Sequence, residues 1–173
     1  MPTKKHQPAD NAAQPRSDRP SMPREYGIQG PKKGSGLIPW ERVVPKIAAA
    51  RNYWIGSTRP DGRPHAMPVW GVWVHELFLF STSRSSRKGR NLAQQPAIVV
   101  HLESGDDVVI LEGAVREVID PVLLAAFAEA YKAKYQFPPD TADPKNVTYA
   151  LHLQLAFAWL ESDFPGGATR WQF

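Results

Sequence analysis

A basic cluster with neighbouring hydroxyl groups is the part of the chain best suited to chemistry. Within seven residues the sequence holds Arg84, Arg87, Lys88 and Arg90. Thr82, Ser85 and Ser86 lie beside them, and no Asp or Glu occurs between Glu76 and Glu103. Arginine can fork onto phosphate oxygens, and lysine can add a point charge. The segment is therefore suited to bind phosphate, although a solvated helix face has a similar composition.

A short helix is expected directly at this cluster, from Ser86 to Gln94. Ser85 or Ser86 can cap its start, and Pro96 follows its end. The first turn of a helix has free N–H groups and the positive end of the helix dipole. A phosphate at this position would meet both the side-chain charges and the backbone donors.

The segment Phe80 to Leu92 resembles the cofactor-phosphate segment of the pyridoxamine 5′-phosphate oxidase-like split barrels, which carry Ser-Arg-Lys-Gly-Arg-x-Leu at this spacing. Residues 53–58, followed by Asp61-Gly62-Arg63-Pro64 and Pro68-Val69-Trp70, resemble the first hairpin of that family. The resemblance extends over about residues 39–173. It implies an oxidoreductase that binds FMN or coenzyme F-420 at the interface of a homodimer.

The same resemblance implies roles for individual residues. Arg87 and Lys88 would hold the cofactor phosphate, and Ser81 and Thr82 would lie along the ribityl chain. Arg90 and Asn91 belong to the same motif and are further candidates for cofactor binding. Met67, Pro68 and Val69 would face the ring system of the cofactor. Arg63 would begin the second-strand stretch that contains them. F-420 has a long acidic tail, so spare cations such as Arg84 or Arg90 would favour it over FMN.

The C-terminal residues separate this chain from true pyridoxamine 5′-phosphate oxidases. Those enzymes carry Gly-Gly-x-x-Arg-x-His, whereas this chain has Gly166-Gly167-Ala-Thr-Arg170-Trp171-Gln172. An amide cannot act as a protonatable ring, so vitamin B6 oxidation becomes a secondary alternative. Arg170, Trp171 and Trp70 are the candidates for substrate binding, and the substrate is expected to be a small unsaturated or aromatic compound. A non-catalytic flavin- or haem-related binding module is the other alternative.

The fold expected around these residues is mainly β, a six-stranded antiparallel split β-barrel with flanking helices. Alternating apolar patterns predict strands at 53–58, 63–74, 77–82, 97–102, 107–118 and 149–161. Gly113 indicates a bulge in its strand. Helices are expected after Pro39 and from Pro121 to about Tyr135, and the tail after Phe164 is expected to be irregular.

Composition limits the remaining possibilities. The chain has 173 residues, 42% of them hydrophobic, and no cysteine. It shows no signal peptide and no apolar stretch of membrane length, which favours the cytoplasm. Residues 1–36 hold seven Lys or Arg and three Asp or Glu, so they account for the whole net charge of +4. We expect them to form a flexible basic arm, either disordered or lying across a partner, before a domain at 37–173. Neither nucleic-acid binding nor a metal site is expected, because no basic helix face or clustered ligands occur.

Overall fold

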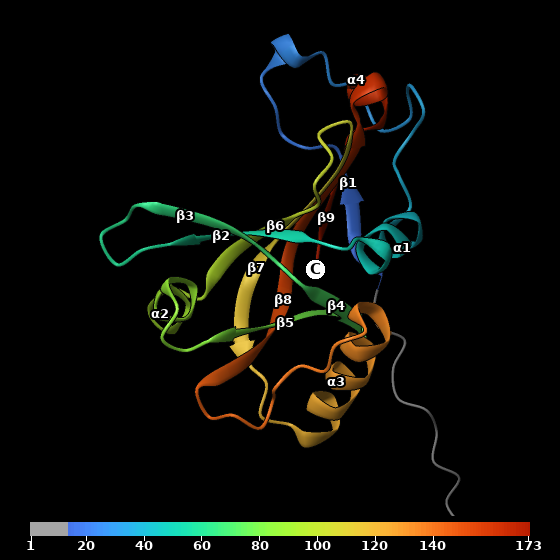
Figure 1. The fold of residues 1–173 in the computed structure, drawn as a ribbon. Coiled ribbons are helices and arrows are strands. Elements are labelled where there is room, and N and C mark those ends of the chain that lie inside the picture. The colour runs from blue at the N-terminus through green and yellow to red at the C-terminus, as the bar shows by residue number, and fades with distance from the viewer. Residues whose placement is uncertain (1–13) are drawn as a thin grey trace, which may run out of the picture.

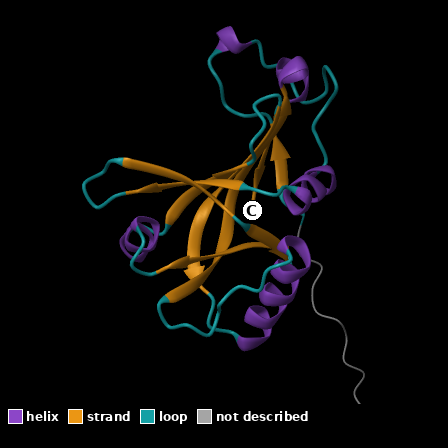
Figure 2. Cartoon of the chain, viewed as in Figure 1, coloured by secondary structure: helices purple, strands orange, loops and turns teal. Residues whose placement is uncertain are grey.

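The computed structural model describes residues 14–173, which form a twisted antiparallel sheet flanked by helices (Figures 1 and 2). The strands are β1 (Arg16–Asp18), β2 (Tyr53–Thr58), β3 (Pro64–Val69), β4 (Gly71–Val74), β5 (Leu77–Ser83), β6 (Ala97–His101), β7 (Asp107–Glu117), β8 (Asn146–Leu160) and β9 (Thr169–Gln172). The helices are η1 (Arg24–Tyr26), α1 (Trp40–Ala49), α2 (Arg87–Gln94), α3 (Pro121–Tyr135), η2 (Glu161–Asp163) and α4 (Phe164–Gly167).

The long strand β8 organises the sheet. It pairs with β7 along nearly its whole length, with β5 through residues 146–151 and with β9 through residues 155–158. From β7 the pairing continues to β6, β2 and β3. The chain itself joins β3 to β4 through Trp70, and β4 pairs only with β5. The predicted split barrel is therefore confirmed, with hydrogen bonding interrupted at Trp70 and the sheet not closed.

The break at Trp70 divides the stretch that we predicted as one strand over 63–74. Pro64 and Pro68 lie in β3, an edge of the sheet path, where a missing N–H leaves no strand neighbour unpaired. Gly71 then begins β4, and a side chain there would overlap the buried ring of Phe78. The chain can change partners at this point because an edge proline and a glycine flank the turn.

Gly113 lies at an irregularity between β7 and β8, as predicted, but the extra residue is Gln154 on β8 and not a residue of its own strand. The register shifts between Glu112 and Gly113, and a Cβ on Gly113 would overlap the carbonyl oxygen of His152. Such an extra residue increases local twist and bends the strand. The bend helps β7 and β8 to curve around the core.

The core fills the space inside the curved sheet. Its largest fully buried side chains include Tyr53, Ile55, Phe78, Phe80, Leu151 and Trp171. Helix α1 closes one end with Val43 and Ile47. Helix α3 packs Phe127 and Tyr135 onto a second cluster that contains Val72 and Leu79. Each fully buried side chain of this size contributes about 1.5–3 kcal/mol to stability.

The two ends of the chain differ from the sequence prediction. The tail expected to be irregular contains β9, which pairs with both β8 and β1. The guanidinium of Arg19 is buried and donates to the carbonyl oxygens of Gly166 at 2.7 Å and Ala168 at 2.8 Å. Residues 16–19 are therefore part of the folded chain and not of a free arm. Residues 1–13 of the predicted arm lie outside the described residues.

None of the helices in residues 14–173 is both long enough and apolar enough to span a membrane.

Candidate functional site

Helix α2 begins with the cap that the sequence predicts. The Ser86 hydroxyl accepts a hydrogen bond from the Gly89 N–H at 2.9 Å and lies 3.1 Å from the Thr82 hydroxyl. A Cβ on Gly89 would overlap the carbonyl oxygen of Ser83. The glycine therefore lets the first turn of α2 press against the end of β5. This close approach fixes the direction in which Lys88 leaves the helix.

Lys88 enters a cavity of about 400 Å³ at the break between β3 and β4, which we call the Lys88 pocket. Five predicted site residues meet there: Pro68, Val69, Trp70, Ser81 and Lys88. The remaining walls are Asn52 and Tyr131, which the sequence did not single out. Residues of β3, β5, the first turn of α2 and α3 thus surround the Lys88 pocket.

The side chain of Lys88 is mostly buried, and its ammonium group has no anionic partner among residues 14–173. The residue is 8% exposed, and burial lowers its pKa to about 8. Within residues 14–173 it takes part in none of the ion pairs, and its Nζ lies 5.5 Å from the centroid of the Phe80 ring. A buried cation in this state is stabilised by any anion that enters the pocket.

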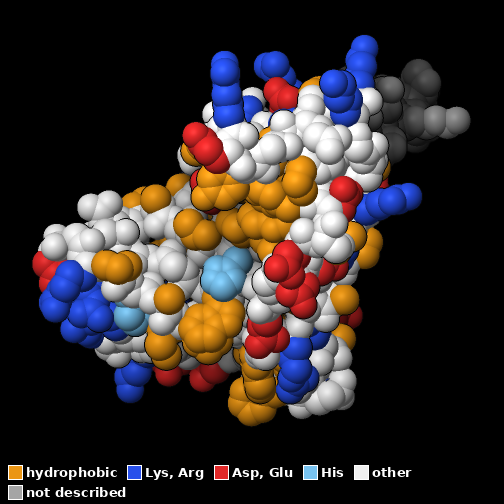
Figure 3. Space-filling model, turned by 90° about the horizontal axis from the view of Figure 1, so that it is seen from above, with side chains coloured by type: hydrophobic (Ala, Val, Ile, Leu, Met, Phe, Trp, Pro, Cys, Tyr) orange, Lys and Arg blue, Asp and Glu red, His pale blue; other side chains and the backbone are white. Residues whose placement is uncertain are grey.

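Positive charge extends from the pocket to the β2–β3 hairpin. Burial lowers the pKa of His65, and the nearby charges of Arg59, Lys88 and Arg87 lower it further. The pKa of Asp61 is also lowered, first by its hydrogen bonds with Arg63. Figure 3 shows Lys and Arg side chains gathered at this end of the molecule. An anionic ligand would approach through a favourable field.

Asn91 ties α2 to the sheet and does not face the pocket. It is fully buried, and its amide nitrogen donates to the Ser57 hydroxyl on β2 at 3.1 Å. Its Oδ1 has no hydrogen-bond partner among the described residues. Asn91 thus positions the helix that carries Lys88.

Trp70 is held in place by a stack on α3. Its ring lies parallel to that of Tyr135, with centroids 4.6 Å apart, and the Arg51 guanidinium lies 5.6 Å from the Trp70 centroid. The Tyr135 hydroxyl accepts from the Gly71 N–H at 3.0 Å and lies 2.8 Å from the carbonyl oxygens of Arg51 and Gly71. These contacts hold Trp70 in place where the sheet hydrogen bonding is interrupted between β3 and β4.

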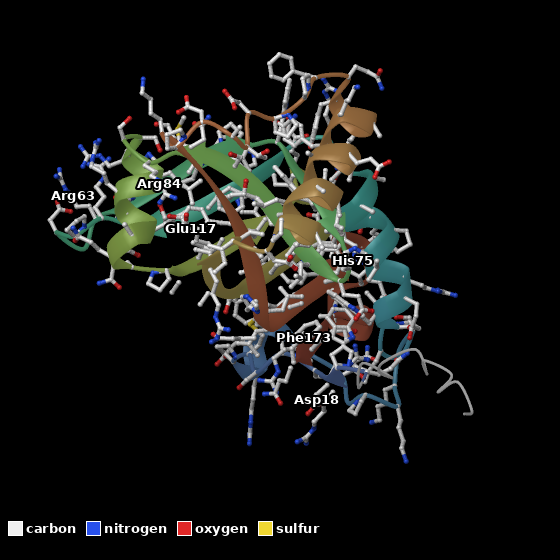
Figure 4. The ribbon with its side chains drawn as sticks, turned by 90° about the horizontal axis from the view of Figure 1, so that it is seen from below. Asp18, Arg63, His75, Arg84, Glu117 and Phe173 are labelled. Atoms are coloured by element: carbon white, nitrogen blue, oxygen red, sulfur yellow. The ribbon has the colours of Figure 1, made fainter. Side chains whose placement is uncertain are left out.

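Several predicted residues lie outside the Lys88 pocket in this single chain. Arg63 is at the exposed hairpin tip, where it pairs with Asp61 at 2.6 Å (Figure 4). Met67 is 49% exposed, Arg87 is exposed, and Thr82 contributes to the α2 cap. Arg90 donates to the carbonyl oxygen of Ser85, which directly precedes the Ser86 cap of its own helix.

Two expectations about side chains need correction. Trp171, expected to line a substrate cleft, is 1% exposed and packs in the core, because its position on β9 points inward. Arg84, considered as a spare cation, pairs with Glu117 and also donates to the Pro144 carbonyl oxygen (Figure 4). Arg170 lies on β9 beside Phe157 of β8, away from the Lys88 pocket of its own chain.

Tyr131 and Asn52 were missed for different reasons. Tyr131 has the helical spacing of a core residue, and its place at the pocket depends on how α3 packs against Trp70. Asn52 directly precedes β2, and a polar residue before a strand resembles an ordinary loop residue. No group of three or more potential metal ligands occurs within residues 14–173.

The sequence model of the family described as Pyridoxamine 5′-phosphate oxidase matches residues 40–159. No curated protein matches the chain. Among solved structures, a conserved hypothetical protein from Mycobacterium tuberculosis has a TM-score of 0.63 and 21% identity, over 71% of this chain and 85% of its own. An F420 reductase has a TM-score of 0.53 and 21% identity, over 64% and 93%. A nimC/nimA family protein from Clostridium acetobutylicum has a TM-score of 0.62 and 10% identity, over 77% and 91%.

Proposed function

The chain belongs to the pyridoxamine 5′-phosphate oxidase family, and from this premise we propose that it is an oxidoreductase that uses FMN or coenzyme F-420. The observation that carries the proposal is Lys88, a mostly buried lysine whose ammonium group has no anionic partner in residues 14–173. Both cofactors carry a ribityl phosphate. A phosphate oxygen is the hydrogen-bond acceptor and counter-charge that this ammonium lacks.

The residues present fit such a phosphate. Lys88 would hold it from α2, and the Ser81 hydroxyl on the neighbouring strand also lines the pocket. The field of Arg59 and Arg87, which lowers the pKa of His65, would draw the anion inward. The cation therefore lines a cavity that a phosphate can enter, which a solvated helix face would not provide.

The remaining walls suit a flat ring system. Pro68, Val69 and Trp70 form a flat apolar rim, and Trp70 is fixed by its stack on Tyr135. When bound, a flavin or deazaflavin supplies the hydride chemistry, and the protein supplies orientation and a shaped site. Trp70 and Tyr131 would shield the ring and a small unsaturated or aromatic substrate from water.

We further propose that the protein acts as a homodimer through the outer face of β2, β6, β7 and β8. Residues opposite one another across these strands share that face, most of them apolar, with Glu112 as a charged member: Trp54, Val99, His101, Val108, Ile110, Glu112, Leu155, Phe157 and Trp159. Figure 3 shows hydrophobic side chains gathered around a histidine there. A large apolar patch favours association. Arg170 pairs in register with Phe157 and so lies on this face, from which it could reach a partner's site.

The test is a fluorescence titration of the apo-protein with FMN and with F-420. We expect submicromolar binding of at least one of them. Lys88→Ala should weaken it by about 10- to 100-fold, because a charged hydrogen bond to phosphate is worth about 1.5–3 kcal/mol. Lys132→Ala, the same change at an exposed position on α3, serves as the matched control and should have no effect.

Two results would contradict the proposal. Failure of both cofactors to bind would remove its basis, and equal losses from Lys88→Ala and Lys132→Ala would show that the cluster acts only as surface charge. Turnover of reduced cofactor with a panel of enones separates an enzyme from a binding module. Binding without turnover of any compound would favour the non-catalytic module.

The dimer is tested by sedimentation. Val99→Glu places a charge in the outer face and should produce monomers, whereas Ile119→Glu, at an 85% exposed position elsewhere, should not. A wild-type protein that sediments as a monomer at micromolar concentration would contradict the proposed interface.

A further inference from the structure

A second cavity, of about 520 Å³, lies between α1, the β4–β5 turn and β8. We call it the Trp40 groove. Its described lining consists of Gln14, Pro15, Trp40, Glu41, Val44, Pro45, Trp73, Glu76, Leu77, His152, Leu153 and Phe173. In Figure 4 the labelled His75 and Phe173 of this region lie far from Arg63 at the hairpin tip. The groove shares no lining residue with the Lys88 pocket.

Aromatic rings form the walls of the Trp40 groove. The Trp40 ring centroid lies 6.3 Å from that of Trp73 and 5.0 Å from that of Phe173, both in edge-on arrangements. Behind them Trp40 contacts Trp171, which is 1% exposed and anchored in the core. The rings are therefore backed by packed side chains. They present a surface on which a flat ring can stack or a cation can rest.

The charged groups of the groove are acidic. Glu41 and Glu76 line it and are exposed, whereas no Lys or Arg is among its described lining residues. The pKa of Glu41 is lowered, first by a backbone hydrogen bond and then by the Gln14 amide. The groove thus presents two carboxylates, and the charged form of Glu41 is further stabilised by these hydrogen bonds. The groove has the opposite sign to the Lys88 pocket and would repel the cofactor phosphates.

The turn that presents Glu76 has an unusual backbone. His75 and Glu76 have φ angles of 49° and 61°, the left-handed region, in the two-residue hairpin loop between β4 and β5. Such loops usually carry Asn-Gly, which adopts this conformation more easily. Strained residues of this kind gather at binding sites, where the surrounding structure holds them. The strain here fixes a carboxylate at the edge of an aromatic groove.

We infer that the Trp40 groove binds a planar aromatic cation. The flat ring would stack on Trp40 or Trp73, with the other ring against its edge because the two planes meet at 65°, and its positive charge would be balanced by Glu41 and Glu76. The volume is within the range of small-molecule sites. Aromatic walls together with carboxylates are the combination that recognises such cations. This site is independent of the cofactor and would hold a substrate or effector of a different charge class.

The test uses proflavine, a planar aromatic cation, titrated into the full-length protein and followed by dye fluorescence. We expect saturable binding at one site per chain. Glu76→Lys should weaken it by about tenfold, because it replaces an attractive charge by a repulsive one. Glu129→Lys, the same change at an exposed position on α3, should leave the affinity unchanged. The anionic dye anilinonaphthalene sulfonate should not compete.

Further variants separate the groove from the cofactor site. Lys88→Ala should leave proflavine binding unchanged, and Glu76→Lys should leave FMN and F-420 binding unchanged. Absence of proflavine binding would overturn the inference. Equal effects of Glu76→Lys and Glu129→Lys would also overturn it, since the dye would then report only general surface charge.

Discussion

Replacing Lys88 by methionine should make the free protein more stable while removing its ability to hold a phosphate. Methionine keeps the length and apolar body of the side chain and deletes the charge. In the free protein that charge has been taken out of water without an anionic partner in the described chain. Deleting it removes a desolvation cost and leaves no described ion pair broken.

The size of the effect follows from the pKa of Lys88. Burial lowers this pKa from 10.5 to about 8, a difference of 2.5 units. One unit corresponds to 1.36 kcal/mol, so the charged form costs the folded state about 3 kcal/mol at most near neutral pH. For a chain of this size the melting temperature should rise by roughly 5–10 °C.

The contribution of Lys88 to the free energy of unfolding should depend on pH. Because the folded pKa is lower than the unfolded pKa, the unfolded chain holds this proton more tightly, and the cost is present in full below about pH 8. Wild-type stability should therefore gain from this group as the pH rises from about 8 to 10.5. The advantage of Lys88→Met should shrink over the same interval.

Thermal unfolding followed by circular dichroism at neutral and alkaline pH measures both effects, with Lys132→Met as the exposed control. A Lys88→Met protein that melts at or below the wild-type temperature near neutral pH would refute the reasoning. So would a gain that does not change with pH, because it would come from packing and not from the lost charge.

Three further outcomes are expected. The association constant for FMN should fall above about pH 8, by about tenfold per pH unit as free Lys88 loses its proton, whereas titrations of Lys88→Arg should show no such fall. Gly89→Ala should move α2 away from the Ser83 carbonyl and weaken cofactor binding at least about tenfold. Unchanged affinity in the same titration would show that the position of α2 does not matter for cofactor binding. Arg19→Ala should cost about 3 kcal/mol, since the buried carbonyls of Gly166 and Ala168 lose their donor, and an unchanged melting temperature would contradict this.

Local signals made much of the fold predictable. Helix α3 begins at Pro121 and ends at Tyr135, as expected from a proline at the first position and a regular apolar face. Ser86 caps α2, and Gly113 marks the bulge. Each of these signals depends on residues within a few positions of one another. These features could therefore be predicted from the local sequence alone.

Contacts between distant residues were not predictable in the same way. Strand β9 is short, follows two glycines, and is stabilised by β1 and β8, so its own residues look irregular. The family motif names Arg63, but the motif does not reveal that Asp61 holds its side chain at the hairpin tip. Tyr131 reaches the Lys88 pocket only because α3 packs behind Trp70. Strand β9 and the position of Tyr131 depend on contacts between residues far apart in the sequence. The position of Arg63 depends on the partner with which its side chain pairs.

The pairing of β1 with β9 has a consequence for biosynthesis. Arg16 lies opposite Gln172, so these two strands are separated by almost the whole length of the chain. During translation β1 cannot pair with β9 until residues 169–172 have emerged from the ribosome. Contacts of such large sequence separation form slowly, and an unpaired strand edge is prone to aggregation.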